Sequence, residues 1–328
     1  MIAGALAIRA DGGASIGAGH VMRSLALADA WQRRGGTVDW FCTPLPQMLD
    51  DLLGSRGITL RRLEHAEDWS ALCAWSSEHP RAWVSIDGYG FCHGAARLRA
   101  AGARVLVIDD DGRWPRYTCD LLLNQNIDAE HVAYQMAPTR RLLGTSFVLL
   151  RREFRQEQPL ARSIDQPGRR VFVSFGGHDA RGMTKRVTQV LLSACSDVEL
   201  DVAGGVVTDA MPPASARLRW HVGTDLSAAM RDADLAVVAA GSVGYELAYL
   251  GVPALTVIVA DNQERIARGL HRAGVTRDLG WADELSDRTI VDALDALRHD
   301  PARAGMSKCG RALVDGDGAD RVVTAMLQ

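Results

Sequence analysis

The sequence predicts an α/β protein made of two Rossmann-like domains, whose parallel sheets face each other across a cleft. Three observations support this fold class. Short apolar runs alternate with amphipathic segments, a polar segment interrupts the pattern near residue 155, and a glycine-rich turn follows the first apolar run of each half. The length of 328 residues also suggests two domains, at roughly 100–200 residues per domain.

The first half, residues 1–157, contains strands that are joined through helices and glycine-rich turns. Strands are expected at Ala5–Ala10, Thr37–Cys42, Ala82–Asp87, Arg104–Asp109 and Cys119–Asn124, and helices at Val21–Arg34 and Phe91–Ala101. Such strands pair in parallel through right-handed crossovers. Both faces of the sheet are then covered, which explains why strands such as VLVI and DLLLN are almost entirely apolar.

A polar linker, Arg155–Arg169, is expected between the halves, since it carries two prolines and shows no periodicity. The second half, residues 158–328, repeats the alternation. Strands are expected at Arg170–Phe175, Glu199–Ala203, Leu235–Ala239 and Ala254–Val259, and helices at Thr184–Ala194, Ser227–Arg231, Gly244–Leu250, Asn262–Ala273, Ile290–Leu297 and Pro301–Gln328, the last with a break at Gly316–Gly318.

Composition and charge argue against several classes of protein. The net charge is -3 and basic residues form no run longer than a pair, so neither a nucleic-acid partner nor membrane insertion is expected. The six cysteines lack metal-binding or redox-pair spacing, so we expect reduced thiols in a cytoplasmic protein, with no metal and no cofactor. Arg9 and Asp11 come too early for a signal peptide.

The segment Asp11–Arg23, DGGASIGAGHVMR, is the first candidate for a functional loop. Gly17 and Gly19 permit positive φ angles and let a ligand approach the backbone. His20 then stands near a helix N-terminus at the carboxyl edge of the sheet, where open α/β folds bind ligands. The helix end favours a neutral imidazole, which suits a general base. Arg23 lies on the same helix face and is expected to bind substrate. The alternative is a plain structural turn.

Polar residues also end three later strands of the first half. Asp87 and Tyr89 end a buried strand and are expected to face the same crevice as His20. Asp109, Asp110 and Asp111 end the next strand, and a solvated acidic turn is favoured for at least Asp111. A metal is not expected there, because consecutive residues point in different directions and form no ligand set. Asn126 follows another strand and is a candidate for substrate binding, unless it only forms the turn.

The second half has a first glycine loop after its opening strand. Ser174, Gly176 and Gly177 precede a helix. Their loop is therefore expected to offer backbone N–H groups to a phosphate or to contact a sugar. Thr184 and Lys185 would add a hydroxyl and a charge. The alternative is a glycine turn with a solvated lysine.

A second glycine loop, AAGSVGYEL, follows a later strand of this half. Gly241 and Ser242 stand where a helix begins, so the open N–H groups are suited to a diphosphate. Glu246 lies about one turn into that helix, where a carboxylate can accept both ribose hydroxyls. Asn262 and Gln263 open the next helix, also at the carboxyl end of a strand, and complete the predicted substrate-binding set.

Taken in this order, these segments resemble the PseG family of UDP-2,4-diacetamido-2,4,6-trideoxy-β-L-altropyranose hydrolases and the related spore-coat polysaccharide proteins. The matching stretches span nearly the whole chain: IRADGGASIGAGHVMRSLALA, IDD, NQN, LLGTSFVLLRREF, SFGGHD with TK, AGSVGYELAYLGVPAL, NQ and DGDGADRVV. The resemblance implies the two-domain GT-B fold of MurG-like glycosyltransferases. It also implies that the second domain holds the nucleotide and that the sugar faces the first.

The resemblance further implies an enzyme that hydrolyses a UDP-sugar of the amino- or deoxy-sugar type, with His20 as its catalytic residue. In that family, water attacks the anomeric carbon, the C–O bond breaks with inversion, and UDP leaves without a metal. We expect His20 to deprotonate the attacking water, helped in orientation by Asp87 or Tyr89. Two alternatives stay open: a glycosyltransferase with the same donor site, and a non-catalytic nucleotide-sugar binding module. Gly88 and Val243 depart from the family pattern, which has histidine and threonine there.

Overall fold

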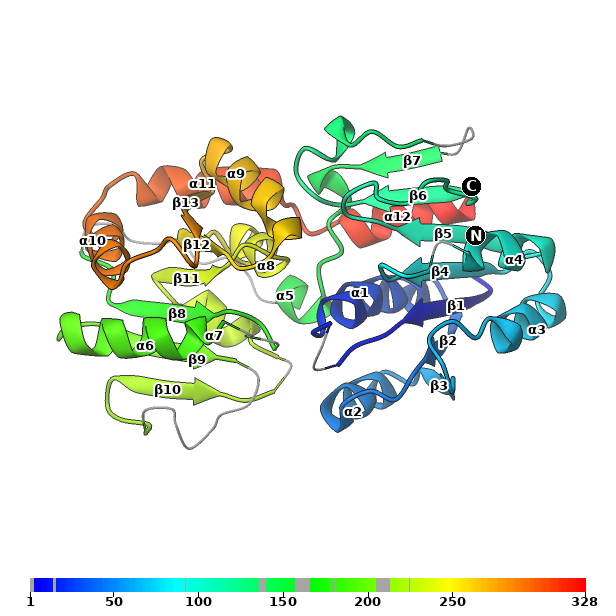
Figure 1. The fold of residues 1–328 in the computed structure, drawn as a ribbon, viewed down its shortest axis with the longest axis horizontal. Coiled ribbons are helices and arrows are strands. Elements are labelled where there is room, and N and C mark those ends of the chain that lie inside the picture. Colours follow the sequence, from blue (N-terminus) through cyan, green and yellow to red (C-terminus); the bar gives the residue numbers. More distant parts are fainter. Residues whose placement is uncertain are drawn as a thin grey trace. The chain divides into compact units, whose positions relative to one another are not determined.

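The computed structural model describes residues 3–13, 16–91, 93–135, 140–156, 166–177, 179, 181–204, 213–223 and 225–328. The chain divides into two compact units: Met1–Arg152 together with Gly316–Gln328, and Glu153–Asp315. Each unit contains one sheet in which every strand pairs in parallel with its neighbours, with helices packed against it (Figure 1). The predicted α/β fold class is therefore confirmed.

The first unit is built on a seven-stranded sheet in the order β3-β2-β1-β4-β5-β6-β7. Its strands are β1 (Ala5–Ala10), β2 (Thr37–Cys42), β3 (Thr59–Arg62), β4 (Trp83–Asp87), β5 (Arg104–Ile108), β6 (Leu121–Asn124) and β7 (Arg140–Leu143), and its helices are α1 (Gly19–Arg33), α2 (Gln47–Ser55), α3 (Ser70–Glu78), α4 (Gly94–Ala100) and α12 (Gly318–Leu327). The chain starts at the centre with β1, moves outward to β3, and returns to β4 on the other side of β1. Such a reversal of strand order is where open α/β sheets bind ligands.

Two apolar cores cover the two faces of this sheet. Leu6 and Ile8 of β1 pack on one face with Leu25 of α1, and Ala7 packs on the other with Leu98 of α4. The alternation follows the two-residue period of a strand. Because both faces are covered, most residues of the central strands are apolar, and Arg9 of β1 is a buried exception.

The last helix, α12, belongs to the first unit. Val322, Val323 and Met326 are fully buried in the same core as α1. The carbonyl of Met326 accepts hydrogen bonds from Trp83 Nε1 at 2.8 Å and from Arg104 at 3.2 Å, and a cation at this end complements the helix dipole. The units thus differ from the predicted ranges 1–157 and 158–328, because the chain returns to the first unit at residue 316.

The second unit repeats the same topology with six strands, in the order β10-β9-β8-β11-β12-β13. Its strands are β8 (Arg170–Ser174), β9 (Glu199–Ala203), β10 (Leu218–His221), β11 (Leu235–Ala239), β12 (Ala254–Ile258) and β13 (Thr276–Trp281), and its helices include α6 (Met183–Ala194), α7 (Ser227–Asp232), α8 (Val243–Leu250), α9 (Glu264–Arg272), α10 (Asp287–Arg298) and α11 (Arg303–Leu313). Here the strand order reverses between β8 and β11. A core of β8, β9, β11, α6 and α10 side chains fills one face.

All nine predicted strands are present, and the predicted break in the C-terminal helical segment separates α11 from α12. Four strands (β3, β7, β10 and β13) and helices α2 and α3 were not predicted. Of the expected linker Arg155–Arg169, residues 157–165 lie outside the described part of the chain, and Arg155 falls within the short helix α5 (Arg152–Gln156).

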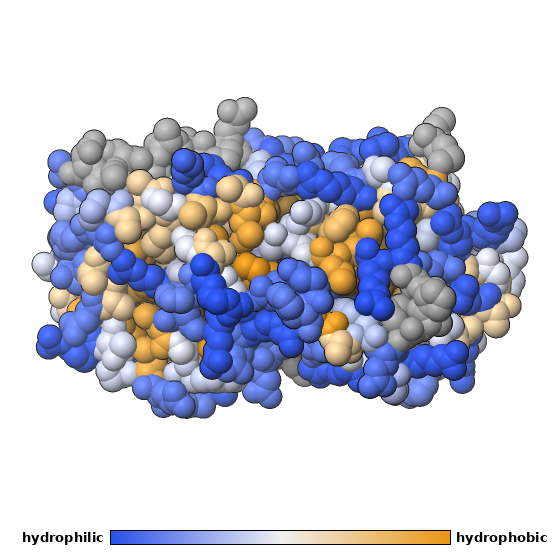
Figure 2. Space-filling model, turned by 90° about the horizontal axis from the view of Figure 1, so that it is seen from above, coloured by the Kyte–Doolittle hydropathy of each residue, from blue (hydrophilic) through white to orange (hydrophobic). Residues whose placement is uncertain are grey.

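The surface seen in Figure 2 is mixed, with hydrophilic residues over most of the face and smaller hydrophobic patches between them. Within the described ranges, every helix is too short or too polar to cross a lipid bilayer.

Candidate functional site

The switch point of the first unit brings together two polar residues that are far apart in the sequence. β1 and β4 are neighbours, with Ala10 in register with Asp87. The loop after β1 leads into α1, whose second residue is His20, and Asp87 is the last residue of β4. The topology therefore places His20 beside Asp87 although 67 positions separate them.

His20 and Asp87 form a buried hydrogen-bonded pair. His20 Nδ1 lies 2.6 Å from Asp87 Oδ1, and the two residues are 7% and 1% exposed. An ionised carboxylate only accepts hydrogen bonds, so Nδ1 carries the hydrogen and donates it. In the neutral imidazole the lone pair is then on Nε2, the arrangement in which the ring accepts a proton from a substrate or a water.

Arg23 joins this pair to a second carboxylate. Its Nε and Nη2 donate to the two oxygens of Asp87, each at 2.7 Å, and its Nη1 donates to Asp110 Oδ1 at 2.7 Å. Asn126 Nδ2 donates to the same Asp110 oxygen at 2.8 Å, and Ser24 Oγ donates to Asp87 at 3.1 Å. The first unit thus gathers four of the predicted residues into one network, and it adds Ser24 and Asp110, which the sequence interpretation missed.

Charge pairing decides the ionisation of this network. Burial alone would raise the pKa of Asp87, but the charge of Arg23 and the hydrogen bonds from Arg23 and His20 outweigh it and hold that pKa well below its usual range. Burial likewise would lower the pKa of Arg23, whereas Asp110 and Asp87 raise it. Asp87 and Arg23 are therefore both charged. Asp87 is buried, and its two oxygens accept from His20, Arg23 and Ser24.

Tyr89 is the accessible member of the group. Its ring meets His20 edge-on with centroids 4.8 Å apart, and the Arg113 guanidinium lies 5.0 Å from its centroid. Large hydrophobic side chains that are exposed among the described residues all follow the carboxyl end of a strand: Ile16 after β1, Met48 after β2, Tyr89 after β4 and Val222 after β10. Three of them, Ile16, Met48 and Tyr89, follow strands of the first sheet, and exposed apolar side chains at such an edge favour a ligand-binding role for it.

The glycines of the β1–α1 loop differ from one another. Gly17 has a φ of +72°, as expected, and it exchanges two backbone hydrogen bonds with Gly13. Gly19 is the first residue of α1 and does not have a positive φ, and a Cβ there would meet nothing within 4 Å. Gly88 is required by packing, because a Cβ would lie 2.5 Å from the Phe91 ring.

In the second unit, the loop after β8 is partly closed by the protein itself. Gly176 has a φ of +85°, and both Gly176 and Gly177 are exposed, whereas Ser174 is only 7% exposed. Asp179 accepts hydrogen bonds from the amides of Met183 and Thr184, which begin α6. These two N–H groups are therefore occupied, and the anion-binding capacity predicted for this helix N-terminus is largely used by Asp179.

The α8 N-terminus is open by comparison. The amides of Gly244, Tyr245 and Glu246 donate to the carbonyls of Gly241 and Ser242, and the amide of Gly241 donates to Ala239. Within the described part of the chain, no acceptor is found for the amides of Ser242 and Val243, as the first turn of a helix leads one to expect. β8 and β11 pair with Ser174 opposite Val238, so the loops after these two strands are adjacent.

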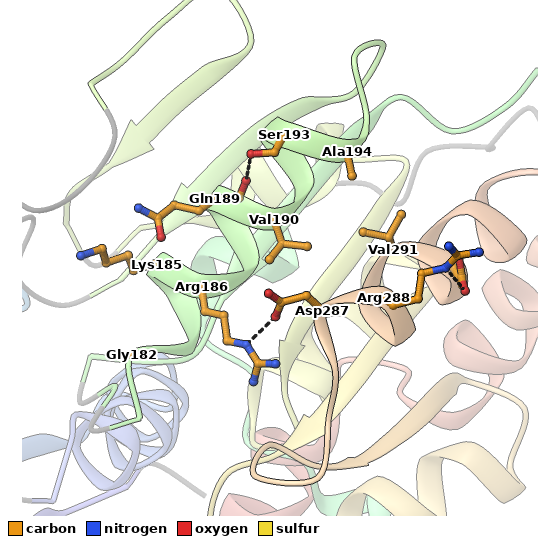
Figure 3. Close-up of a pocket in the computed structure, with 11 residues that line it drawn as sticks. Gly182, Lys185, Arg186, Gln189, Val190, Ser193, Ala194, Asp287, Arg288 and Val291 are labelled. Atoms are coloured by element: carbon orange, nitrogen blue, oxygen red, sulfur yellow. Dashed lines mark hydrogen bonds and ion pairs between the residues drawn. The ribbon is translucent and has the colours of Figure 1, made fainter.

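The remaining predicted residues lie nearby but differ in what they offer. Glu246 is half-buried in the first turn of α8, and Asn262 is exposed in the turn after β12. Gln263 uses its Oε1 to accept from the amide of Val259 at 3.0 Å, which ties the turn to the strand end. Lys185, which the sequence places after the first glycine loop, lines a groove of about 670 Å³ between α6 and α10 (Figure 3).

Asp128, Glu130 and His131 are the one described group whose ligand atoms have a spacing suited to a metal ion, all within 4.8 Å. Glu130 and His131 are exposed, and the group lies in a surface turn. Among the described residues nothing else points to a ligand there, and we assign the group no role.

No family model matches the sequence. The spore-coat polysaccharide biosynthesis protein SpsG of Bacillus subtilis is 27% identical over 240 residues, which are 68% of this chain and 68% of that protein. The UDP-2,4-diacetamido-2,4,6-trideoxy-β-L-altropyranose hydrolase of Campylobacter jejuni is 28% identical over 188 residues, which are 56% of this chain and 64% of that protein. About a third of each relative therefore lies outside the alignment.

Solved structures extend the likeness over the whole chain. MurG of Acinetobacter baumannii has a TM-score of 0.68 at 17% identity, with 99% of each chain covered. The spinosyn forosaminyltransferase SpnP has a TM-score of 0.70 at 16% identity, with 100% of each chain covered. The chain thus has the GT-B fold of these glycosyltransferases, and its sequence relatives include SpsG and the PseG-type hydrolase.

Proposed function

We propose that this protein is an enzyme that hydrolyses a nucleotide-sugar, most simply a UDP-sugar of the amino- or deoxy-sugar type. The single observation that carries the proposal is the buried His20–Asp87 pair at the switch point of the first unit. A histidine whose Nδ1 is fixed by a carboxylate and whose Nε2 is left as an acceptor is the usual form of a catalytic general base. The similarity to the C. jejuni hydrolase supports the choice of reaction.

In the proposed reaction, Nε2 of His20 takes a proton from water as the water oxygen bonds to the anomeric carbon. The bond from that carbon to the phosphate oxygen breaks with inversion, and its electron pair leaves with UDP. The free sugar keeps the new hydroxyl. Tyr89 is placed to contact the sugar, while Asp87 acts as a positioning residue through His20.

The nucleotide is assigned to the second unit. The open amides of Ser242 and Val243 are suited to the diphosphate, and Glu246 to the ribose. Three structures similar in fold are named as complexes with UDP or thymidine diphosphate, which supports a nucleoside diphosphate here. Electrostatic support of the leaving group by such donors contributes about 3–4 kcal/mol per donor in comparable sites.

A glycosyltransferase is the second candidate, because several structures similar over the whole chain are named as glycosyltransferases. Its donor site would be the same, with an acceptor hydroxyl in place of water. The two functions differ in what they require. Hydrolysis releases nucleotide and free sugar without an acceptor, whereas transfer proceeds only when an acceptor is added.

The test is a panel of UDP-, dTDP- and CMP-sugars with detection of the released nucleotide, followed by NMR of the anomer first formed. His20→Asn should bind UDP with an unchanged Kd and lose about 10²–10⁴-fold in turnover, the usual contribution of a general base. His299→Asn is the matched control, because His299 is exposed at the C-terminal end of α10. Normal turnover by His20→Asn would refute the proposed role of this residue.

A further inference from the structure

Arg23 is bound by the protein to an extent that leaves little for a substrate. Its Nε, Nη1 and Nη2 each donate to a carboxylate oxygen, and its side chain is 10% exposed. Three of its five N–H donors are thus used. Both carboxylates belong to other elements of the first unit, Asp87 to the end of β4 and Asp110 to the loop after β5.

The position of Arg23 relative to the imidazole has an electrostatic consequence. Arg23 Nη2 lies 3.3 Å from Nδ1 of His20, while Asp87 Oδ1 lies 2.6 Å from the same nitrogen. A buried carboxylate at this distance favours the protonated imidazole, which is no longer a base. A buried guanidinium at 3.3 Å opposes that effect, because a second positive charge beside it is disfavoured.

In the described part of the chain, few other charged groups lie near the His20 imidazole. Around the imidazole are Asp87 from β4, Arg23 from α1, Asp110 behind Arg23, and Tyr89, whose far side carries the Arg113 guanidinium. Arg113 is itself paired with Asp111. The N-terminus of α1 adds a partial positive charge at His20. Among the described residues, Arg23 is therefore the cation that balances Asp87 at contact distance.

We infer that Arg23 is a positioning residue whose charge keeps the His20 imidazole neutral, while Asp87 holds the hydrogen on Nδ1, and that Arg23 does not bind the substrate. This role differs from the substrate contact expected from the sequence. Its kinetic consequence rests on the proposed function, but its effect on the imidazole does not.

The direct experiment is an NMR titration of the imidazole nitrogens in the full-length protein, with the His20 signal assigned by its loss in His20→Asn. Arg23→Gln removes the charge, and Arg23→Lys retains it. We expect the His20 titration midpoint to rise by about 1–3 pH units in Arg23→Gln, the usual effect of a neighbouring charge. In Arg23→Lys we expect a much smaller change. An unmoved midpoint in Arg23→Gln would overturn the inference.

A second variant tests the same idea with the opposite sign. Asp110→Asn removes an anion that partly neutralises Arg23, so the His20 midpoint should fall. If Arg23→Gln does not fold, as judged by circular dichroism, this variant decides alone, and a midpoint that rises or stays unchanged contradicts the inference.

Kinetics separate the two roles of Arg23. If a nucleotide-sugar is hydrolysed, the acid limb of the kcat/KM profile of Arg23→Gln should move to higher pH by the same amount as the NMR midpoint, with little change in KM above that limb. A tenfold rise in KM with kcat unchanged and no shift of the limb would make Arg23 a substrate ligand. If the wild-type protein hydrolyses no nucleotide-sugar while the NMR midpoint moves as expected, the proposed function fails and the inference stands.

Discussion

Asp87→Asn is the substitution that measures how strongly the His20 network is built into the first unit. Asp87 accepts four hydrogen bonds, one from His20, two from Arg23 and one from Ser24, and it is 1% exposed. Asparagine has nearly the same shape, but an NH₂ group, which donates hydrogen bonds, replaces one of the two carboxylate oxygens. Two donors then face each other, and Arg23 loses one of its two carboxylate counter-charges.

The expected loss in the free energy of unfolding is about 3–5 kcal/mol at pH 7, the range for a buried ion pair from which one partner is removed. This loss is a large part of the stability of an ordinary domain, about 5–15 kcal/mol. Six of the eight tryptophans fall within residues of the first unit, so urea unfolding followed by tryptophan fluorescence reports mainly on that unit.

The pH dependence gives an independent check on the charge of Asp87. Because the folded pKa of Asp87 is depressed, its stabilising contribution is complete above the unfolded value of about 3.9 and is lost as the pH falls through the lower folded value. The difference in stability between wild type and Asp87→Asn should therefore narrow below about pH 4.

The matched control is Asp111→Asn, which makes the same change in a partly exposed ion pair with Arg113 at the same sheet edge. Its expected cost is at most about 1 kcal/mol. Two results would show that Asp87 is not a buried, ionised carboxylate. One is a loss in the free energy of unfolding for Asp87→Asn at pH 7 that is no larger than that of the control. The other is a loss that stays constant as the pH is lowered to about 3.5.

Two further predictions concern stability away from this network. Met326→Ala should lower the free energy of unfolding of the first unit by about 2–5 kcal/mol, because Met326 is fully buried in its core. Thr324→Ala, on the exposed side of the same helix, should lower it by less than about 0.5 kcal/mol. Equal losses in urea unfolding would argue against the docking of α12. Asp179→Ala should lower the free energy of unfolding by about 0.5–2 kcal/mol, since it leaves two amides of α6 without an acceptor. Ser242→Ala should leave it almost unchanged, because the Ser242 side chain makes no capping hydrogen bond. Thermal unfolding followed by circular dichroism distinguishes these outcomes.

The strands that sequence reasoning found and those it missed differ in their place in the sheets. Every predicted strand lies in the interior of its sheet, and all four missed strands, β3, β7, β10 and β13, lie at an edge. Interior strands are covered on both faces, so their apolar runs stand out. Edge strands such as TLRR and LRWH carry charged residues and are half exposed, so they resemble loops in the sequence.

The candidate site was predictable where strand ends determine it. His20, Asp87 and Tyr89 follow β1 and β4, and the rule for open sheets is sufficient to group them. The direction of each side chain could not be predicted from the sequence. The three consecutive aspartates after β5 do not reveal which of them faces the site, and it is Asp110 that accepts hydrogen bonds from Arg23 and Asn126. Asp179 likewise accepts from two amides at the helix end that the glycine loop predicts as an anion site.

The return of the chain to the first unit at residue 316 affects how this protein can be divided. A fragment that stops near residue 157 would keep all seven strands and the His20 network, but it would leave uncovered the apolar surface against which Val322, Val323 and Met326 pack. Such a fragment would be prone to aggregate for a reason unrelated to its site. Residues 153–315 are in effect an insertion within the first unit, so an isolated version of that unit should join residue 152 to residue 316 through a short flexible connector.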